Sequence, residues 1–175
     1  MTSYTILVAC FFLVLWVVFT YIKFTSLGKK ITKIWLECQP FLNKRYQVFP
    51  ILINITKNQA GFDPSKLATL QYIYTQASDS RIGLEIQFEN DRQATVLILE
   101  SLVFLQNYPN ILLNPEFIKL EAYLIGIENQ LNLLKDNYNV LVEEYNMSLN
   151  VTPANIMAKL MQLQPKDFLP IANYS

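Results

Sequence analysis

The front of the chain is an unbroken apolar run. Thr2 to Ile22 contains no charged residue, and ILVACFFLVLWVVF at residues 6–19 is almost wholly apolar. At 1.5 Å per residue, a helix of this length measures about 30 Å, the thickness of a bilayer's hydrocarbon core. The pattern therefore predicts a transmembrane helix over Thr5–Ile22.

Two other interpretations of this run are weaker. A cleaved signal peptide has a basic start and a small-residue cleavage site, but no Lys or Arg precedes Lys23. The stretch LVAC at residues 7–10 resembles the lipobox of bacterial lipoproteins. Against that alternative, the basic start is missing and the most apolar stretch continues beyond Cys10. We expect Cys10 to be a small apolar residue facing lipid or another helix.

Past the apolar run the pattern is helical throughout, and cap chemistry marks where helices begin. Each of three pairs places a side-chain acceptor before a proline, which is typical of a helix start. These pairs are Asp63 with Pro64, Asn114 with Pro115, and Thr152 with Pro153. They predict helices that begin near 64, 115 and 153, the last running to about 163. Asp79 and Ser80 are candidate caps for a further helix over roughly 84–107.

The stretch before residue 58 reads as one long helix that contains Pro40 and Pro50. Each proline removes a backbone hydrogen bond, so we expect a kink or a break there. Gly28 is a candidate joint between the span and the bundle.

The helix from Pro115 carries a heptad seam, the pattern by which long helices pack at shallow angles. Nine of its ten positions are apolar or aromatic, and Ser148 is the exception. The ten are Phe117, Leu120, Leu124, Ile127, Leu131, Leu134, Tyr138, Leu141, Tyr145 and Ser148. The predicted fold is all-α, with an N-terminal transmembrane helix followed by an antiparallel up-and-down bundle of long helices. The predicted segments are 1–22 for the tail and span, 23–34 for a basic juxtamembrane stretch, and 35–175 for the bundle.

Charge gives the expected orientation. Lys23, Lys29, Lys30 and Lys33 follow the span, and no basic residue precedes it. Positive charge stays on the cytoplasmic side, so the N-terminus is expected outside and residues 23–175 in the cytoplasm. The formal net charge of zero combines +5 over residues 1–45 with −5 over the remainder. The basic part can lie on anionic headgroups, whereas the acidic part argues against nucleic-acid binding.

Residues for common catalytic chemistry are scarce. The chain has no histidine, and its two cysteines, Cys10 and Cys38, lie in the predicted span and in the segment after it. Gly-rich phosphate loops, metal-ligand spacings and nucleophile motifs are also missing. We therefore expect no enzyme activity, no cofactor and no metal site.

Residues 108–146 resemble the C-terminal signature of the LemA family, which has a Tyr-Pro pair, spaced Asn, Phe, Leu, Leu and Glu, then two Tyr-Asn pairs. The matching residues are Tyr108, Pro109, Asn114, Phe117, Leu120, Leu124, Glu128, Tyr138, Asn139, Tyr145 and Asn146. Upstream, the residues similar to the family are Trp35, Leu42, Lys44, Arg45 and Pro50. The resemblance implies a bacterial, membrane-anchored, antiparallel helical bundle and no particular activity. Residues 60–107 do not align clearly.

Departures from the family pattern are few. The family tends to carry acidic residues at Gln39 and Gln47, Asn at Ile51, and Arg at Lys135. Lys lacks the bidentate fork of Arg, so a buried Glu–Arg pairing in relatives would be weaker or rearranged here.

Four sets of candidate site residues each have a structural interpretation that we favour. Glu128 and Lys135 could form a buried pair that builds a pocket, but ion pairs are often merely structural or solvated. Lys44 and Arg45 could grip phosphate, but a solvated face near the membrane is the preferred interpretation. Trp35 is expected to be a buried or interfacial aromatic. Tyr108 and Pro109 are expected to form a turn.

The favoured function is a membrane-tethered scaffold or adaptor that binds a protein partner at the inner face of the membrane. The alternatives are a bundle that binds lipid or another apolar ligand between its helices, and a membrane-associated enzyme.

Overall fold

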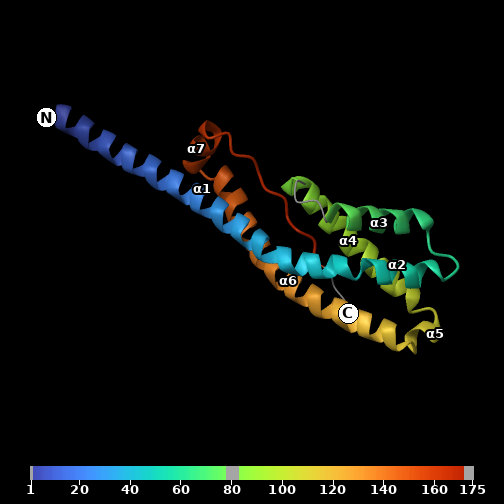
Figure 1. The fold of residues 1–175 in the computed structure, drawn as a ribbon. Coiled ribbons are helices and arrows are strands. Elements are labelled where there is room, and N and C mark those ends of the chain that lie inside the picture. Colours follow the sequence, from blue (N-terminus) through green and yellow to red (C-terminus); the bar gives the residue numbers. More distant parts are fainter. Residues whose placement is uncertain (1, 78–82, 172–175) are drawn as a thin grey trace. The chain divides into compact units, whose positions relative to one another are not determined.

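The computed structural model describes residues 2–77 and 83–171, and within them the chain is entirely helical, without strands (Figure 1). The helices are α1 (Thr2–Gln47), α2 (Phe49–Lys57), α3 (Pro64–Ala77), α4 (Leu84–Leu105), α5 (Pro109–Leu112), α6 (Pro115–Asn150) and α7 (Ala154–Leu160). The predicted all-α class is confirmed. The candidate caps Asp79 and Ser80 lie outside the described residues.

The described residues form two compact units. The N-terminal unit contains residues up to Leu36 together with Asn137–Phe168, and the central unit contains Glu37–Asp136 and the residues from Leu169. Helices α1 and α6 each contribute one part to either unit.

Two of the three predicted proline starts are capped as expected. The Asp63 carboxylate accepts a hydrogen bond from the Ser65 amide at 2.8 Å, and Asn114 Oδ1 accepts one from the Glu116 amide at 2.8 Å. These side chains satisfy amides that the first helical turn leaves without a partner. The third helix begins at Ala154, close to the predicted 153, but without the expected cap: α7 has no side-chain cap, and the Thr152 hydroxyl accepts a hydrogen bond from Asn155 Nδ2 instead. Helix α7 also ends at Leu160, before the predicted 163.

Helix α1 runs through both Gly28 and Pro40, so Gly28 is not a joint. The break comes instead at Val48, between α1 and α2 and two residues before Pro50. Proline has no amide hydrogen to donate to the carbonyl one turn earlier, which interrupts helical hydrogen bonding at this point. The Val48 amide closes a tighter turn on the Arg45 carbonyl at 3.3 Å, and α2 begins at the next residue.

The central unit buries a continuous hydrophobic core. Its members come from Val48 at the break before α2, from α2, α3, α4 and α5, and from the first part of α6. They are Val48, Phe49, Leu52, Leu70, Ile73, Ala94, Leu97, Ile98, Leu102, Leu105, Ile111, Phe117, Leu120 and Leu124. Helix α2 packs against both α3 and α4, which also contact each other. Tyr108 begins the turn into α5, as predicted, and its hydroxyl donates to the Ala60 carbonyl at 2.6 Å.

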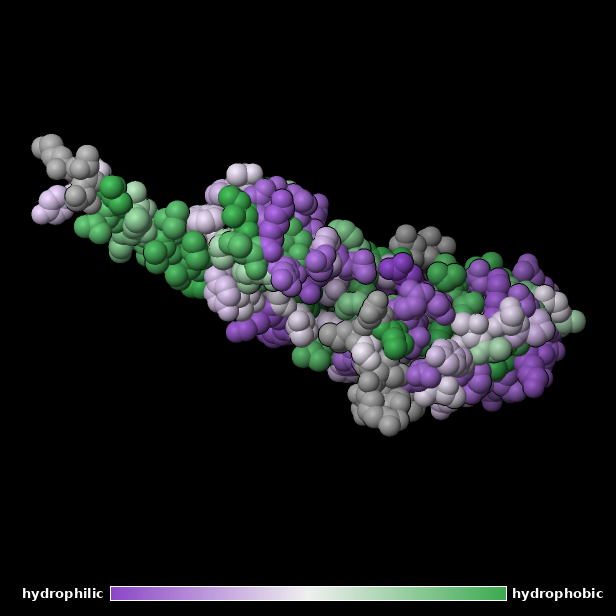
Figure 2. Space-filling view, turned by 90° about the horizontal axis from the view of Figure 1, so that it is seen from above, coloured by the Kyte–Doolittle hydropathy of each residue, from purple (hydrophilic) through white to green (hydrophobic). Residues whose placement is uncertain are grey.

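The N-terminal unit exposes most of the apolar run. Large side chains such as Phe12 and Phe19 are more than 60% exposed, and they give the first part of α1 a continuous hydrophobic surface (Figure 2). This part of the helix is long and apolar enough to span a membrane. Burial begins at Thr20 and continues at helical spacing through Phe24, Leu27, Ile31 and Trp35.

The predicted seam of α6 is right at eight of its ten positions. Those at 117, 120, 124, 127, 131, 138, 145 and 148 are all buried. Leu134 and Leu141 are only half-buried, and the residues that follow them, Lys135 and Val142, are buried instead. A straight helix has 3.6 residues per turn, so its buried face drifts from a strict 3.5 repeat. That drift of one position places Glu128 and Lys135 on the inner face.

Candidate functional site

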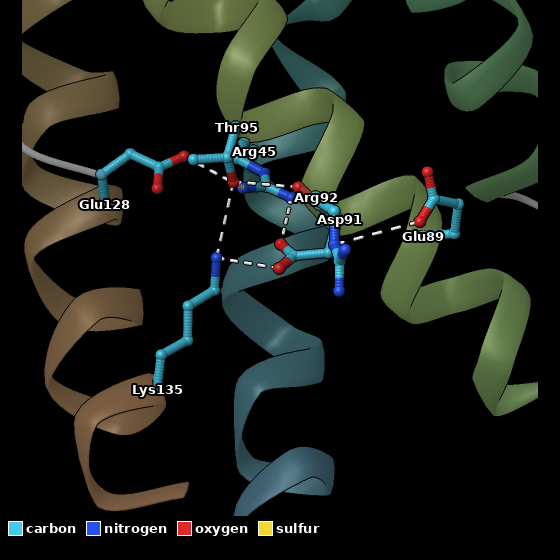
Figure 3. Close-up of polar contacts among 7 residues, drawn as sticks. All are labelled: Arg45, Glu89, Asp91, Arg92, Thr95, Glu128 and Lys135. Atoms are coloured by element: carbon cyan, nitrogen blue, oxygen red, sulfur yellow. Dashed lines mark hydrogen bonds and ion pairs between the residues drawn. The ribbon is translucent and has the colours of Figure 1, made fainter. Parts of the chain in front are cut away.

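Five polar side chains meet inside the central unit and form what we term the ionic lock. Arg45 comes from α1, Asp91 and Thr95 from α4, and Glu128 and Lys135 from α6 (Figure 3). The four charged residues have no exposed surface, and Thr95 is 5% exposed. Two cations face two carboxylates, so the charges of the lock balance.

Arg45 is the centre of the lock. Its Nη2 lies 2.6 Å from Asp91 Oδ1, and its Nη1 lies 3.2 Å from Glu128 Oε1. Lys135 Nζ contacts the other oxygen of Asp91 at 2.9 Å. Both cations also donate to the Thr95 hydroxyl, from Arg45 Nη1 at 3.1 Å and from Lys135 Nζ at 3.5 Å. Thr95 in turn donates to the Asp91 backbone carbonyl at 2.9 Å, which fixes its oxygen as an acceptor for the cations.

The local geometry follows from helical spacing. Asp91 and Thr95 are four residues apart on α4, and Glu128 and Lys135 are seven apart on α6, so each pair shares one face of its helix. Burial is the largest influence on Arg45 and by itself opposes its charge. Asp91 and then Glu128 act in the opposite direction and prevail, so the pKa of Arg45 is raised. Arg45 therefore carries its charge in the core.

Cys38 lies in the same unit and is fully buried. Burial, and next the negative charge of Asp91, raise the pKa of the thiol to about 11. The thiolate is the nucleophilic form of cysteine. At neutral pH Cys38 is therefore a small packing residue rather than a reactive one.

The charged groups of the lock are closed off from solvent, and this limits the chemistry that they can perform. A catalytic group must reach a substrate, but the charged groups here bind one another and contact no solvent. The neighbouring pair of Glu89 and Arg92 is exposed on the outer side of α4 and does not join the lock (Figure 3). Among the described residues, no group of three or more His, Cys, Asp or Glu could hold a metal ion. The arrangement joins α1, α4 and α6 and is structural.

Two interpretations of the candidate residues need correction. Arg45 is not part of a solvated face; only Lys44 is exposed, with its Nζ 5.6 Å from the centre of the Phe41 ring. Glu128 and Lys135 are both buried, but the structure joins them through Arg45, Asp91 and Thr95 rather than as a solvated pair.

Asp91 and Thr95 were missed, because they fall in the stretch without a clear family resemblance. A signal was present. Asp91 precedes Ala94, Ile98 and Leu102 by three, seven and eleven residues, so a carboxylate sits on the apolar face of a helix. A buried carboxylate at such a position is expected only where a cation forms an ion pair with it.

The remaining candidate residues lie outside the lock. Trp35 is 1% exposed and is a buried aromatic as expected, and Tyr138 is also 1% exposed. Pro50 is exposed at the start of α2. Pro109 begins α5, and Asn114 caps α6. Asn139 is half-buried. The structure therefore brings only Arg45, Glu128 and Lys135 of the candidate set into one site.

The second Tyr-Asn pair holds the C-terminal segment of the N-terminal unit. Tyr145 packs edge-on against Phe24 with ring centres 5.9 Å apart. The Asn146 side chain makes two hydrogen bonds with the backbone of Lys166: its Nδ2 donates to the Lys166 carbonyl at 2.8 Å, and its Oδ1 accepts from the Lys166 amide at 2.9 Å. The ammonium group of Lys166 then lies 5.5 Å from the centre of the Tyr145 ring.

This clamp gives a local prediction. Asn146→Ala should release the segment around Lys166, and the Lys166 amide should exchange its hydrogen much faster because its acceptor is gone. Asn146→Asp keeps the acceptor oxygen and removes the donor, so protection of that amide should fall less. Hydrogen exchange resolved to this peptide measures both. Equal protection in wild type and Asn146→Ala would contradict the clamp.

A second feature of the central unit is a groove between α2 and α6 of about 820 Å³, open to solvent on one side. It is lined by Val48, Pro50, Ile51, Asn54, Glu116, Lys119, Leu120 and Tyr123. Ile51 and Tyr123 are about half exposed, whereas Val48 and Leu120 form a buried floor. Glu116 and Lys119, less than one turn apart on α6, add one charge of each sign to this otherwise mainly apolar surface.

Comparison with known sequences adds the family. A search of curated proteins found no significant match. The LemA family profile matches residues 34–175, which include the ionic lock, the groove and both Tyr-Asn pairs. Because the match spans most of the chain, the protein belongs to the LemA family.

Proposed function

We propose that the protein is a membrane-tethered scaffold that offers the groove between α2 and α6 to a helix of a partner protein. The observation that carries the proposal is the groove itself, which exposes apolar side chains between two helices of a tightly locked unit. Exposed apolar surface that is rimmed by polar groups marks interaction sites on proteins.

Membrane attachment is the first part of the proposal. Most side chains from Tyr4 to Ile22 are exposed, although Thr20 is buried, and the hydrophobicity of the segment suits lipid. The lysines that follow favour a cytoplasmic location for the residues after the span, by the positive-inside rule. A scaffold needs such a fixed location because it acts by holding its partner there.

The shape and charge of the groove indicate the kind of partner. Two helices with an apolar floor between them form a surface into which the apolar face of a third helix can pack. Glu116 and Lys119 then favour a partner helix with a basic and an acidic residue at matching positions. Ile51 occupies a position at which the family tends to carry Asn, so this chain favours a more apolar partner than its relatives would.

The lock supports this role. A pre-formed surface binds with less loss of conformational freedom than one that must first be ordered. Arg45 is three residues before Val48 in the floor of the groove, and Glu128 is five residues after Tyr123. The lock therefore fixes the end of α1 that leads into α2, and it fixes α6, which lines the groove directly.

Site-specific crosslinking in intact membranes tests the proposal. A photoreactive phenylalanine at Tyr123 should capture one protein, with the crosslink mapped to a helix of that protein. Tyr72 on α3 is the matched control, since it is a tyrosine of similar exposure that does not line the groove. It should capture nothing specific.

Charge dependence decides whether a captured protein is a true occupant. Lys119→Glu should abolish capture at Tyr123, and reversal of the matching acidic residue in the partner should restore it. Capture that is as efficient in Lys119→Glu as in wild type would contradict the docking geometry. Capture of lipid alone would favour an apolar-ligand binding bundle, and capture of a second copy of this chain would favour self-association.

A further inference from the structure

The four lysines after the span do not lie on one face of α1. Lys29, Lys30 and Lys33 line a shallow cavity of about 430 Å³ together with Tyr21, Ile22, Thr25 and Ser26. Lys23 lies on a different face, beside a cavity that it shares with Glu144 and Met147. Both cavities belong to the N-terminal unit.

The first cavity changes in character along the helix. Tyr21 and Ile22 form its apolar end and are both more than half exposed. One turn later come the hydroxyls of Thr25 and Ser26, and the three lysines complete the far end. No carboxylate lines this cavity among the described residues. The order of apolar, hydroxyl and cationic groups matches the order of acyl chain, glycerol and phosphate in a phospholipid.

Depth in the membrane agrees with this order. The headgroup layer adds about 5–8 Å to each side of the hydrocarbon core. Thr25 and Ser26 follow Ile22 by three and four residues, or about 5 Å along a helix, and Lys29 follows by about 10 Å. Helical side chains lean toward the N-terminus of their helix, and here that direction is back toward the span. The ammonium groups of Lys29 and Lys30 can therefore reach the phosphate level from positions beyond it, and Lys33, about 16 Å from Ile22 along the helix, marks the outer end of the cavity.

From this arrangement we propose that Lys29, Lys30 and Lys33, with Thr25 and Ser26, form a site for the headgroup of an anionic phospholipid. The site rests on the membrane attachment proposed above and adds a lipid preference to it. It differs from a diffuse basic attraction in one respect. A diffuse attraction would depend most on Lys23, the lysine closest to the span, whereas the site excludes Lys23.

The experiment uses the full chain in nanodiscs of phosphatidylcholine with a minor fraction of phosphatidylglycerol. Native mass spectrometry then measures which lipid stays bound. Wild type should retain phosphatidylglycerol in preference to phosphatidylcholine. Lys29→Gln and Lys30→Gln should each lower this preference about fivefold, the factor expected for one lysine near an anionic surface. Lys33→Gln should lower it less, because Lys33 is farther from the span. Lys23→Gln is the matched control and should leave the preference nearly unchanged.

Each contrary outcome has a distinct meaning. Equal losses for Lys23→Gln and Lys29→Gln would overturn the site in favour of diffuse attraction. A chain that enters the discs with no lipid preference would overturn the site and leave the scaffold proposal intact. A chain that does not enter the discs would overturn both. In phosphatidylcholine discs, an inorganic phosphate adduct that Lys29→Gln removes would assign the site to free phosphate and overturn a lipid site.

Discussion

Arg45→Met should lower the free energy of unfolding by about 3–5 kcal/mol, which is the range for breaking a buried ion pair from one side. The substitution keeps an unbranched apolar side chain, two atoms shorter than that of arginine, and removes the cation. Asp91 and Glu128 would remain in the core with Lys135 as the only buried cation of the lock, and the unit would hold an uncompensated negative charge. Urea unfolding of the full chain in detergent micelles, followed by circular dichroism, measures the change.

Two variants sharpen this test. Adding Glu128→Gln to Arg45→Met removes the uncompensated charge, so the double variant should be more stable than Arg45→Met alone. Arg92→Met is the matched control: Arg92 is on α4 and its pair with Glu89 is long and exposed, so its loss should change stability by less than about 1 kcal/mol. Additive losses in the double variant would show that the charges of the lock do not act together.

Tyr138→Ala and Tyr145→Ala should each lower the free energy of unfolding by about 3–5 kcal/mol, as is typical when a buried aromatic ring is truncated. Tyr138 is 1% exposed, and Tyr145 packs against Phe24. The matching Phe variants keep the ring and should lose only about 1 kcal/mol, the net value of one hydrogen bond. Thermal unfolding of the full chain in micelles compares the four. Ala variants that melt like wild type would contradict a packing role for the Tyr-Asn pairs.

Local signals in the sequence predicted the elements of the fold well. Asp63 and Asn114 cap the helices that they were expected to cap, because each accepts from a backbone amide only two residues along the chain and needs no distant partner. Thr152 does not cap α7, because its hydroxyl accepts a hydrogen bond from the Asn155 side chain instead. The predicted joint at Gly28 is not present, because glycine permits a bend in the backbone without requiring one, and α1 continues through it.

The site was harder to predict because it depends on partners distant in sequence. Arg45, Asp91 and Glu128 are far apart in the chain, and only the packing of three helices joins them. A strict heptad also places Lys135 one position outside the seam, whereas the real drift of an α-helix turns it inward. The groove could not be foreseen either, since it depends on where α2 turns away after Val48.

Because the Cys38 thiol is buried, the stability of the central unit determines how fast this thiol is chemically modified. While the unit is closed, oxidants and electrophiles meet neither an accessible sulfur nor a thiolate. Each opening exposes a thiol of ordinary acidity, and an oxidised or alkylated sulfur carries atoms for which the closed core has no room. A modified chain cannot close again, so opening becomes irreversible in an oxidising medium. The rate of such ageing is then set by how often the unit opens, and therefore by the strength of the ionic lock around Arg45.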